Sequence, residues 1–179
     1  MKKLTLNIFT VLTLVFLFAC KENKNTSEST SEEINKTEKD ATQLSDDELL
    51  DIVQKQTLKY FWDYAEPNSG LGRERFHPDG NYPNKDPQTV TTGGSGFGLM
   101  GIVVGMERNF IDREEAVNRL DKIANFLENT PRYHGAWPHW IDGETANTES
   151  FGSDSKDNGG DIVETSFLAQ GFIVVREYL

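Results

Sequence analysis

Four stretches of the chain place their apolar residues at helical spacing, and two patterns alternate along them. Residues 45–65 and 112–128 are apolar on one face only, which is typical of half-exposed helices. Residues 95–108 and 161–178 are apolar on nearly every side, which predicts helices that are buried on nearly every side. Two concentric layers of outer and inner helices would require this alternation. The sequence therefore predicts an all-α fold.

The residues at the helix starts predict caps, and the glycines of one helix predict close packing. Ser45 precedes Glu48 by three residues, and Asp112 precedes Glu115 in the same way, so each pair predicts a capping box. The stretch 95–108 is instead rich in glycine, which destabilises a helix unless it permits close packing. We therefore expect a close helix contact there. The apolar face of 112–128 comprises Ala116, Val117, Leu120, Ile123, Ala124 and Leu127.

Two long loops separate the helices. Residues 66–90 are rich in Gly, Pro, Asn and Asp, the residues of turns. A second loop of about 30 residues follows Pro131 and contains Asp142-Gly143, which predicts a tight hairpin turn. The segment Thr92–Gly96 is also glycine-rich. It lacks the Gly-Lys-Ser/Thr ending of a phosphate-binding loop, and no strand is predicted before it.

The N-terminus has the pattern of an export signal. Two lysines precede the apolar run 4–18, which is too short for a stable membrane span, and the run leads to Cys20. The ending Leu17-Phe18-Ala19-Cys20 resembles the lipobox of bacterial lipoproteins. The alternative is an ordinary signal peptide with an incidental free cysteine. We predict a signal peptide over 1–19, a lipid anchor on Cys20 in the cell envelope (periplasmic or at the cell surface), a disordered tether over 20–44 and a folded domain over 45–179.

The charge of the chain excludes one class of partner. The 179 residues carry a net charge of −11, and removal of the two leader lysines leaves 16 basic against 29 acidic residues. A nucleic-acid-binding protein needs a basic surface, so none is expected here. A neutral polysaccharide suits this charge better. His77, His134 and His139 lack metal-binding spacing, and we predict no metal site and no cofactor.

Asp161 and Glu164 are the first candidate for chemistry, because two carboxylates three residues apart share one face of a helix. Glycoside hydrolysis uses one carboxyl to protonate the leaving oxygen and a second to activate water or to attack carbon. The alternative is structural, since Asp-x-x-Glu at a helix start is also a capping box. The pair Asp112 and Glu115 has the same spacing and receives only that structural role.

Aromatic and basic residues of the two long loops are the second candidate. Trp137, His139 and Trp140 lie close together in the sequence, and indole rings stack well on pyranose rings. The alternative is that these aromatic residues only pin the loop to the core. Arg73 lies in the charged run 73–77, which could equally be a solvated loop with surface ion pairs.

Five stretches together carry a family resemblance. They are Tyr60-Phe61-Trp62, Gly70-Leu71 with 73–80, Thr92–Leu99, Gly135–Trp140 and Lys156–Ser166. The segment from about Leu49 to Leu179 resembles the N-terminal part of the glucoamylase-like bacterial proteins that include the endo-β-1,2-glucanases, glycoside hydrolase family 144.

The resemblance implies the N-terminal part of an (α/α)6 toroid that hydrolyses β-1,2-glucan with inversion. It places the catalytic pair on Asp161 and Glu164, and it places Arg73, Trp137, His139 and Trp140 along the substrate groove. Family members are much longer, and the chain stops on an all-apolar helix, so we expect a truncated and inactive fragment of a monomeric enzyme. An inverting pair stands about 6.5–9.5 Å apart, which leaves room for a partner acid in later helices. The competing hypothesis is a non-catalytic glycan-binding lipoprotein of an uptake system.

Overall fold

The computed structural model describes residues 43–84, 86–150 and 158–179. The chain divides into two units, residues 1–49 and 50–179, and each is described by itself. The predicted signal peptide, Cys20 and nearly all of the tether lie outside the described residues. In the first unit, Glu48 Oε2 accepts a hydrogen bond from Ser45 N (2.9 Å), and Ser45 Oγ accepts one from Glu48 N (3.3 Å). This reciprocal pair confirms the first capping box.

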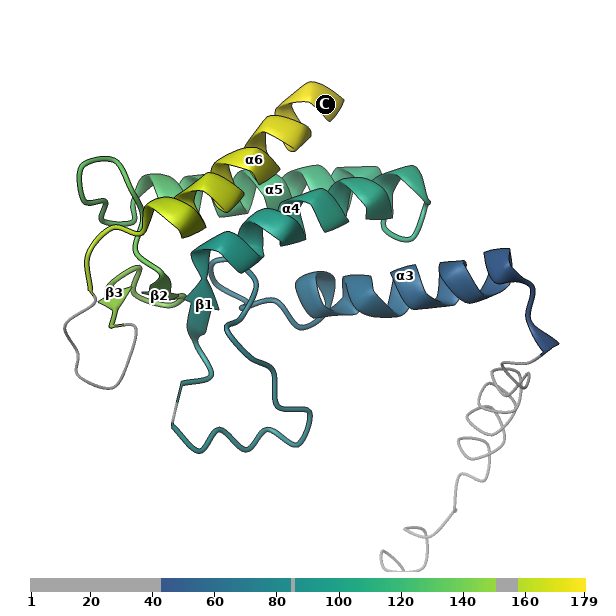
Figure 1. The fold of residues 1–179 in the computed structure, drawn as a ribbon, viewed down its shortest axis with the longest axis horizontal. Coiled ribbons are helices and arrows are strands. Elements are labelled where there is room, and N and C mark those ends of the chain that lie inside the picture. The colour runs from purple at the N-terminus through teal and green to yellow at the C-terminus, as the bar shows by residue number, and fades with distance from the viewer. Residues whose placement is uncertain (1–42, 85, 151–157) are drawn as a thin grey trace, which may run out of the picture. The chain divides into compact units, whose positions relative to one another are not determined.

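Four helices and three short strands make up the regular structure of the described residues (Figure 1). The helices are α3 (Asp46–Trp62), α4 (Thr92–Glu107), α5 (Arg113–Glu128) and α6 (Ile162–Tyr178). The strands are β1 (Thr89–Thr91), β2 (Trp140–Asp142) and β3 (Thr148–Glu149). All four predicted helices are therefore confirmed, to within three residues at each end.

The small sheet corrects the prediction of an all-α fold, because the described residues are mostly helical but not entirely so. The strands pair antiparallel in the order β1-β2-β3, with Val90 opposite Ile141. Both of these side chains are fully buried, so burial of one sheet face compensates for ordering the loops. The sheet lies beside the starts of α4 and α6 (Figure 1). A strand therefore does precede the glycine-rich start of α4, contrary to the expectation from the sequence.

The prediction of a tight turn at Asp142-Gly143 is also wrong, because the loop is longer than predicted. Residues 143–147 connect β2 to β3, so the hairpin loop has five residues rather than two. Asp142 Oδ1 accepts hydrogen bonds from Glu144 N (2.9 Å) and Thr145 N (2.7 Å). Gly143 N donates to Gln88 O (2.9 Å) instead of closing a two-residue turn. The aspartate side chain thus organises a longer loop.

Helices α4 and α6 cross in backbone contact, which confirms the close packing expected from the glycines. A Cβ atom added to Gly96 would lie 2.2 Å from the carbonyl oxygen of Phe167. One added to Gly171 would lie 2.4 Å from the carbonyl oxygen of Gly96. No side chain fits in so small a gap, so glycine is required at both positions of this crossing.

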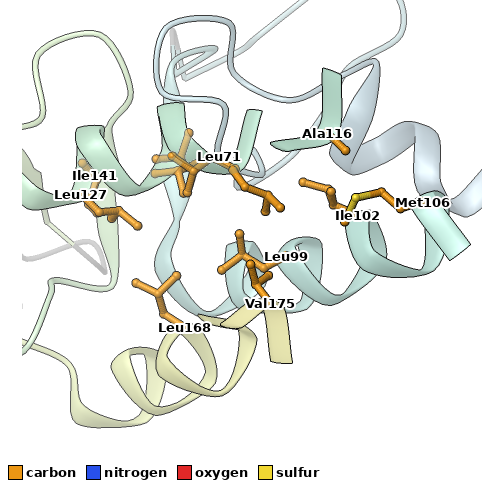
Figure 2. Packing of buried hydrophobic residues seen from close by; sticks show 12 residues of the cluster. Leu71, Leu99, Ile102, Met106, Ala116, Leu127, Ile141, Leu168 and Val175 are labelled. Carbon is orange, nitrogen blue, oxygen red and sulfur yellow. The ribbon is translucent and has the colours of Figure 1, made fainter. Parts of the chain in front are cut away.

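The core gathers side chains from α4, α5, α6 and the two long loops (Figure 2). At the start of α5, Asp112 accepts hydrogen bonds from the backbone N–H groups of Glu114 and Glu115, which confirms the Asp112 half of the second capping box. Two residues of the predicted apolar face of α5, Val117 and Ala124, are exposed instead. The buried cluster consists of Leu71, Val90, Leu99, Ile102, Met106, Ala116, Leu120, Ile123, Leu127, Ile141, Leu168 and Val175.

The helices α4 and α6 are not buried on nearly every side, contrary to expectation. Phe97 and Val104 on α4 are 50% and 46% exposed, and Ile162 on α6 is 76% exposed. The described neighbours cover only one side of each helix, so the opposite apolar side faces outward. Within the described ranges, no helix combines the length and the apolar character that crossing a membrane would need.

Candidate functional site

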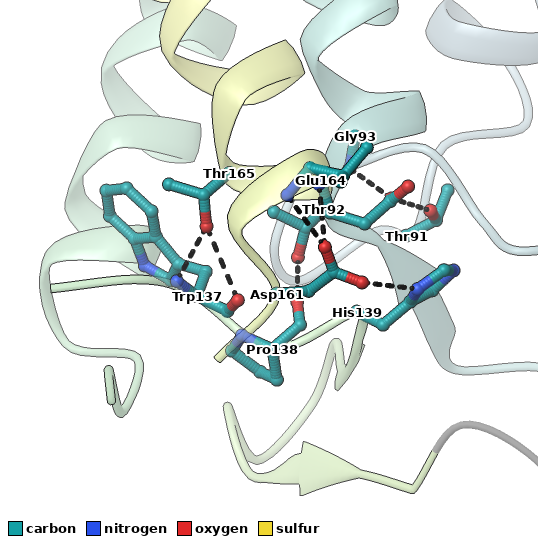
Figure 3. A network of polar contacts seen from close by, with 10 residues as sticks. Thr91, Thr92, Gly93, Trp137, Pro138, His139, Asp161, Glu164 and Thr165 are labelled. Atoms are coloured by element: carbon teal, nitrogen blue, oxygen red, sulfur yellow. Dashed lines mark hydrogen bonds and ion pairs between the residues drawn. The ribbon is translucent and has the colours of Figure 1, made fainter. Parts of the chain in front are cut away.

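Asp161 is the N-cap of α6 and also contacts a predicted site residue. Its Oδ1 accepts hydrogen bonds from Val163 N (2.9 Å) and Glu164 N (3.0 Å), as the structural interpretation required. Its Oδ2 lies 3.0 Å from His139 Nδ1 (Figure 3). One carboxylate therefore caps its own helix and holds the imidazole of the second long loop.

The pKa of Asp161 is lowered from its ordinary value. Partial burial by itself would raise the pKa, but hydrogen bonds from Glu164 N–H, from the His139 ring and from Val163 N–H outweigh that effect. Asp161 is consequently a carboxylate at neutral pH. An ionised carboxylate can accept a proton from water but cannot protonate a leaving group.

Glu164 extends away from its own helix to the start of α4. Its Oε2 accepts hydrogen bonds from Gly93 N (2.8 Å) and from Thr91 Oγ1 (3.3 Å) (Figure 3). In a capping box this carboxylate would bind Asp161 N, but Asp161 N donates to Trp137 O (2.8 Å). The capping-box interpretation is therefore confirmed for Asp161 and wrong for Glu164.

Gly93 makes the approach of Glu164 possible. A Cβ atom at position 93 would lie 2.6 Å from Glu164 Oε2, so any side chain would displace the carboxylate. The free backbone N–H groups at a helix start attract negative charge. The glycine-rich start of α4 thus binds an internal carboxylate.

Hydrogen bonds connect residues 137–139 to the starts of α4 and α6. Thr165 Oγ1 accepts a hydrogen bond from Trp137 N (2.9 Å) on the α6 side. On the α4 side, Thr92 Oγ1 donates to Pro138 O (2.5 Å), and Thr92 N donates to His139 O (3.1 Å). These bonds fix the backbone that carries His139 beside Asp161 (Figure 3).

The structure places Trp137 and Trp140 in different surroundings. Trp137 packs against the core, and its Nε1 donates to Leu127 O (3.1 Å), so this indole pins the loop to α5. The Trp140 ring meets the His139 ring edge-on, with ring centroids 5.8 Å apart. His139 and Trp140 therefore lie together near Asp161, whereas Trp137 makes a structural contact.

Arg73 lies on the other face of the sheet from Trp140. It forms a bridge opposite the buried Val90, and opposite residues of antiparallel strands share a face. Trp140 is opposite Thr91, one residue further along, and so belongs to the alternate face. The Nε of Arg73 donates to Tyr64 O (3.0 Å). Its contacts hold the first long loop to the end of α3.

Four residues that shape this site were not singled out from the sequence. Thr91 and Gly93 bind Glu164 between the two helix starts, and Thr92 and Thr165 bind the loop residues Pro138 and Trp137. Three of them belong to, or adjoin, the stretch that begins at Thr92 and contributes to the family resemblance. Within the described part of the chain, no group of three or more His, Cys, Asp or Glu residues is placed to hold a metal ion.

The geometry defines a mostly helical protein in which two carboxylates and an aromatic pair meet where two helices begin. Glycoside hydrolases commonly use two carboxyl groups as their catalytic groups. No family model matches the chain. It is similar to the exo-β-1,2-glucooligosaccharide sophorohydrolase (non-reducing end) of Parabacteroides distasonis, with 51% identity over 135 residues. That match covers 75% of this chain and 18% of the relative, so the chain spans less than a fifth of that protein.

Two solved structures are similar over about three quarters of the chain. The endo-β-1,2-glucanase of Chitinophaga pinensis, in complex with sophorotriose and glucose, is 58% identical with a TM-score of 0.72. A glucoamylase-like protein of Bacteroides fragilis is 55% identical with a TM-score of 0.73. The matches cover 75% and 78% of this chain and 32% of each of those chains. The relatives are thus β-1,2-glucanases and glucoamylase-like proteins.

Proposed function

We propose that this chain is part of a glycoside hydrolase that cleaves β-1,2-linked glucan, with inversion, as a member of glycoside hydrolase family 144. The observation that carries the proposal is the pair Asp161 and Glu164, set between two helix starts in a segment 51–58% identical to β-1,2-glucanases. By the same resemblance, residues 45–179 form the N-terminal part of an (α/α)6 toroid. The alternation of amphipathic and apolar helices supports that architecture.

The environment of Asp161 favours one role in this reaction. Because its pKa is lowered, Asp161 is ionised and suits the base that takes a proton from the attacking water. The proton donor is then Glu164 or a further carboxyl of the whole enzyme, in keeping with the wide separation of an inverting pair. His139 and Trp140 stand beside this carboxylate as sugar-binding residues. A sugar contact by Trp137 or Arg73 stays a prediction, since the contacts described for both are structural.

The test is product release by the full-length gene product. Incubation with β-1,2-glucan is expected to yield new reducing ends and short sophoro-oligosaccharides, which chromatography resolves. Glucans of β-1,3 or β-1,4 linkage are the controls and should remain uncut. If calorimetry detects oligosaccharide binding but long incubation yields no new reducing ends, a non-catalytic glycan-binding protein is the better account.

We also propose that Cys20 carries a lipid that holds the protein in the cell envelope, on the basis of the leader sequence. Cells supplied with a labelled fatty acid should incorporate the label into the wild-type protein. The Cys20→Ala variant should lack it. Equal labelling of both proteins, or of neither, would contradict the anchor.

A further inference from the structure

The sheet face that carries Trp140 holds a third carboxylate. Thr91, Trp140 and Glu149 lie directly opposite one another across β1, β2 and β3. Opposite residues of antiparallel strands point to the same side, so these three side chains form one row. Val90 and Ile141 belong to the other face and are buried in the core.

This row connects to the candidate site at one end. Thr91 Oγ1 donates to Glu164 Oε2 (3.3 Å), and the Trp140 ring meets His139, the partner of Asp161. Trp140 therefore stands between the Glu164 side of the site and Glu149. Strands lie about 4.8 Å apart, so Thr91 and Glu149 have their backbones about 10 Å apart on either side of the indole. Glu149 is directly opposite Trp140 on the neighbouring strand, so the two side chains are adjacent on this face.

Glu149 is held in position by Thr89. Its Oε2 accepts a hydrogen bond from Thr89 Oγ1 (2.5 Å), and the side chain is partly buried. Among the described residues, no hydrogen bond to its Oε1 is found. Burial raises the pKa of Glu149, the Thr89 hydroxyl lowers it, and the carboxylates of Asp142 on β2 and Asp86 before β1 raise it further. The net direction is upward, so Glu149 ionises at a higher pH than an ordinary glutamate.

We propose that Glu149 is a specificity-determining residue whose carboxylate accepts hydrogen bonds from the hydroxyls of a glucose unit lying against Trp140. The inference rests on the proposed function and extends it to a residue outside the Asp161–Glu164 pair. Aromatic stacking holds a sugar ring without regard to its hydroxyls, whereas a fixed acceptor at the ring edge distinguishes them. No proton transfer or covalent step is assigned to Glu149.

The inference is tested by the kinetics of the full-length protein on sophorotriose. Glu149→Ala is expected to raise KM about tenfold with kcat within about twofold of wild type, the loss of one hydrogen bond to a charged group. Glu144→Ala is the matched control, because Glu144 is exposed in the hairpin loop next to the same sheet. It should leave KM unchanged. Equal KM values for the two variants would overturn the inference.

The pH dependence of KM provides a second readout, which serves if Glu149→Ala fails to fold. Glu149→Gln keeps an acceptor for Thr89 and should melt like wild type. The ionised carboxylate is the stronger acceptor, so wild-type KM should fall as pH rises through the raised pKa of Glu149. The Gln variant should lack that step. A step that persists in the Gln variant would contradict the inference.

Calorimetric titration with sophorotriose separates this inference from the proposed function. If wild type yields no new reducing ends but Glu149→Ala still weakens binding about tenfold, the hydrolase proposal fails and the Glu149 site stands. If hydrolysis proceeds and Glu149→Ala binds the trisaccharide as tightly as wild type, only the Glu149 site fails.

Discussion

Gly96→Ala is expected to lower the free energy of unfolding by about 3 kcal/mol, the upper range for an overpacked core. The new methyl group would lie 2.2 Å from the Phe167 carbonyl oxygen, and backbone atoms cannot rotate away as a flexible side chain could. The helices α4 and α6 would have to separate, which removes contacts along both. Chemical denaturation of the full-length protein, followed by circular dichroism, measures the change.

Gly101→Ala is the matched control on the same helix. A Cβ atom there would lie 3.9 Å from its nearest neighbours, an ordinary contact distance. Since alanine is the better helix former, this variant should be more stable than wild type by about 0.5–1 kcal/mol. If Gly96→Ala is as stable as Gly101→Ala, the close crossing of α4 and α6 is wrong.

Asp161→Asn and Glu164→Gln should each reduce the rate of sugar release from β-1,2-glucan by about 10²- to 10⁴-fold, the usual contribution of a general acid or base. Both variants should keep the melting temperature of wild type. Asparagine caps a helix as well as aspartate does, and a glutamine oxygen can accept from Gly93 N and Thr91 Oγ1. The substitutions therefore separate chemistry from structure.

The chain supplies its own controls for this prediction. Asp112 and Glu115 have the same spacing at the start of α5, and Asp112 caps that helix as Asp161 caps α6. Asp112→Asn and Glu115→Gln should leave the rate of sugar release within about twofold of wild type, because neither touches the site. Normal rates in both Asp161→Asn and Glu164→Gln would defeat the catalytic assignment.

The helices could be predicted from the sequence because each of the four is 16 or 17 residues long. Over such a length the apolar period repeats several times, and the caps at Ser45 and Asp112 mark the starts. The close packing of α4 followed from its glycines. What periodicity could not reveal was which sides of α4 and α6 are covered, because that depends on neighbours distant in the sequence.

The sheet could not be predicted because its strands have at most three residues. An alternation of period two cannot be recognised over so short a stretch. Thr89 pairs with Asp142, more than fifty residues away, and only the folded chain brings them together. The sequence therefore could not predict which side chains share a face of the sheet, nor that Glu149 lies beside Trp140.

The candidate site was predicted in part. The sequence indicated Asp161, Glu164, His139 and Trp140, and the structure brings Asp161 to His139 and Trp140 to His139. It could not indicate that Glu164 binds the start of α4, since the same spacing at Ser45 and Glu48 gives a reciprocal cap. The difference arises because the N–H group of Asp161 is already bound to Trp137 O.

The central claim is that the start of α6 presents Asp161 and Glu164 to a bound glucan. A crystal structure of the full-length Asp161→Asn variant with a β-1,2-linked trisaccharide tests it most directly. We predict sugar oxygens within hydrogen-bond distance of residue 161 and Glu164, with a glucose ring against Trp140. A trisaccharide bound elsewhere, with Glu164 and residue 161 contacting only the protein, would contradict the account.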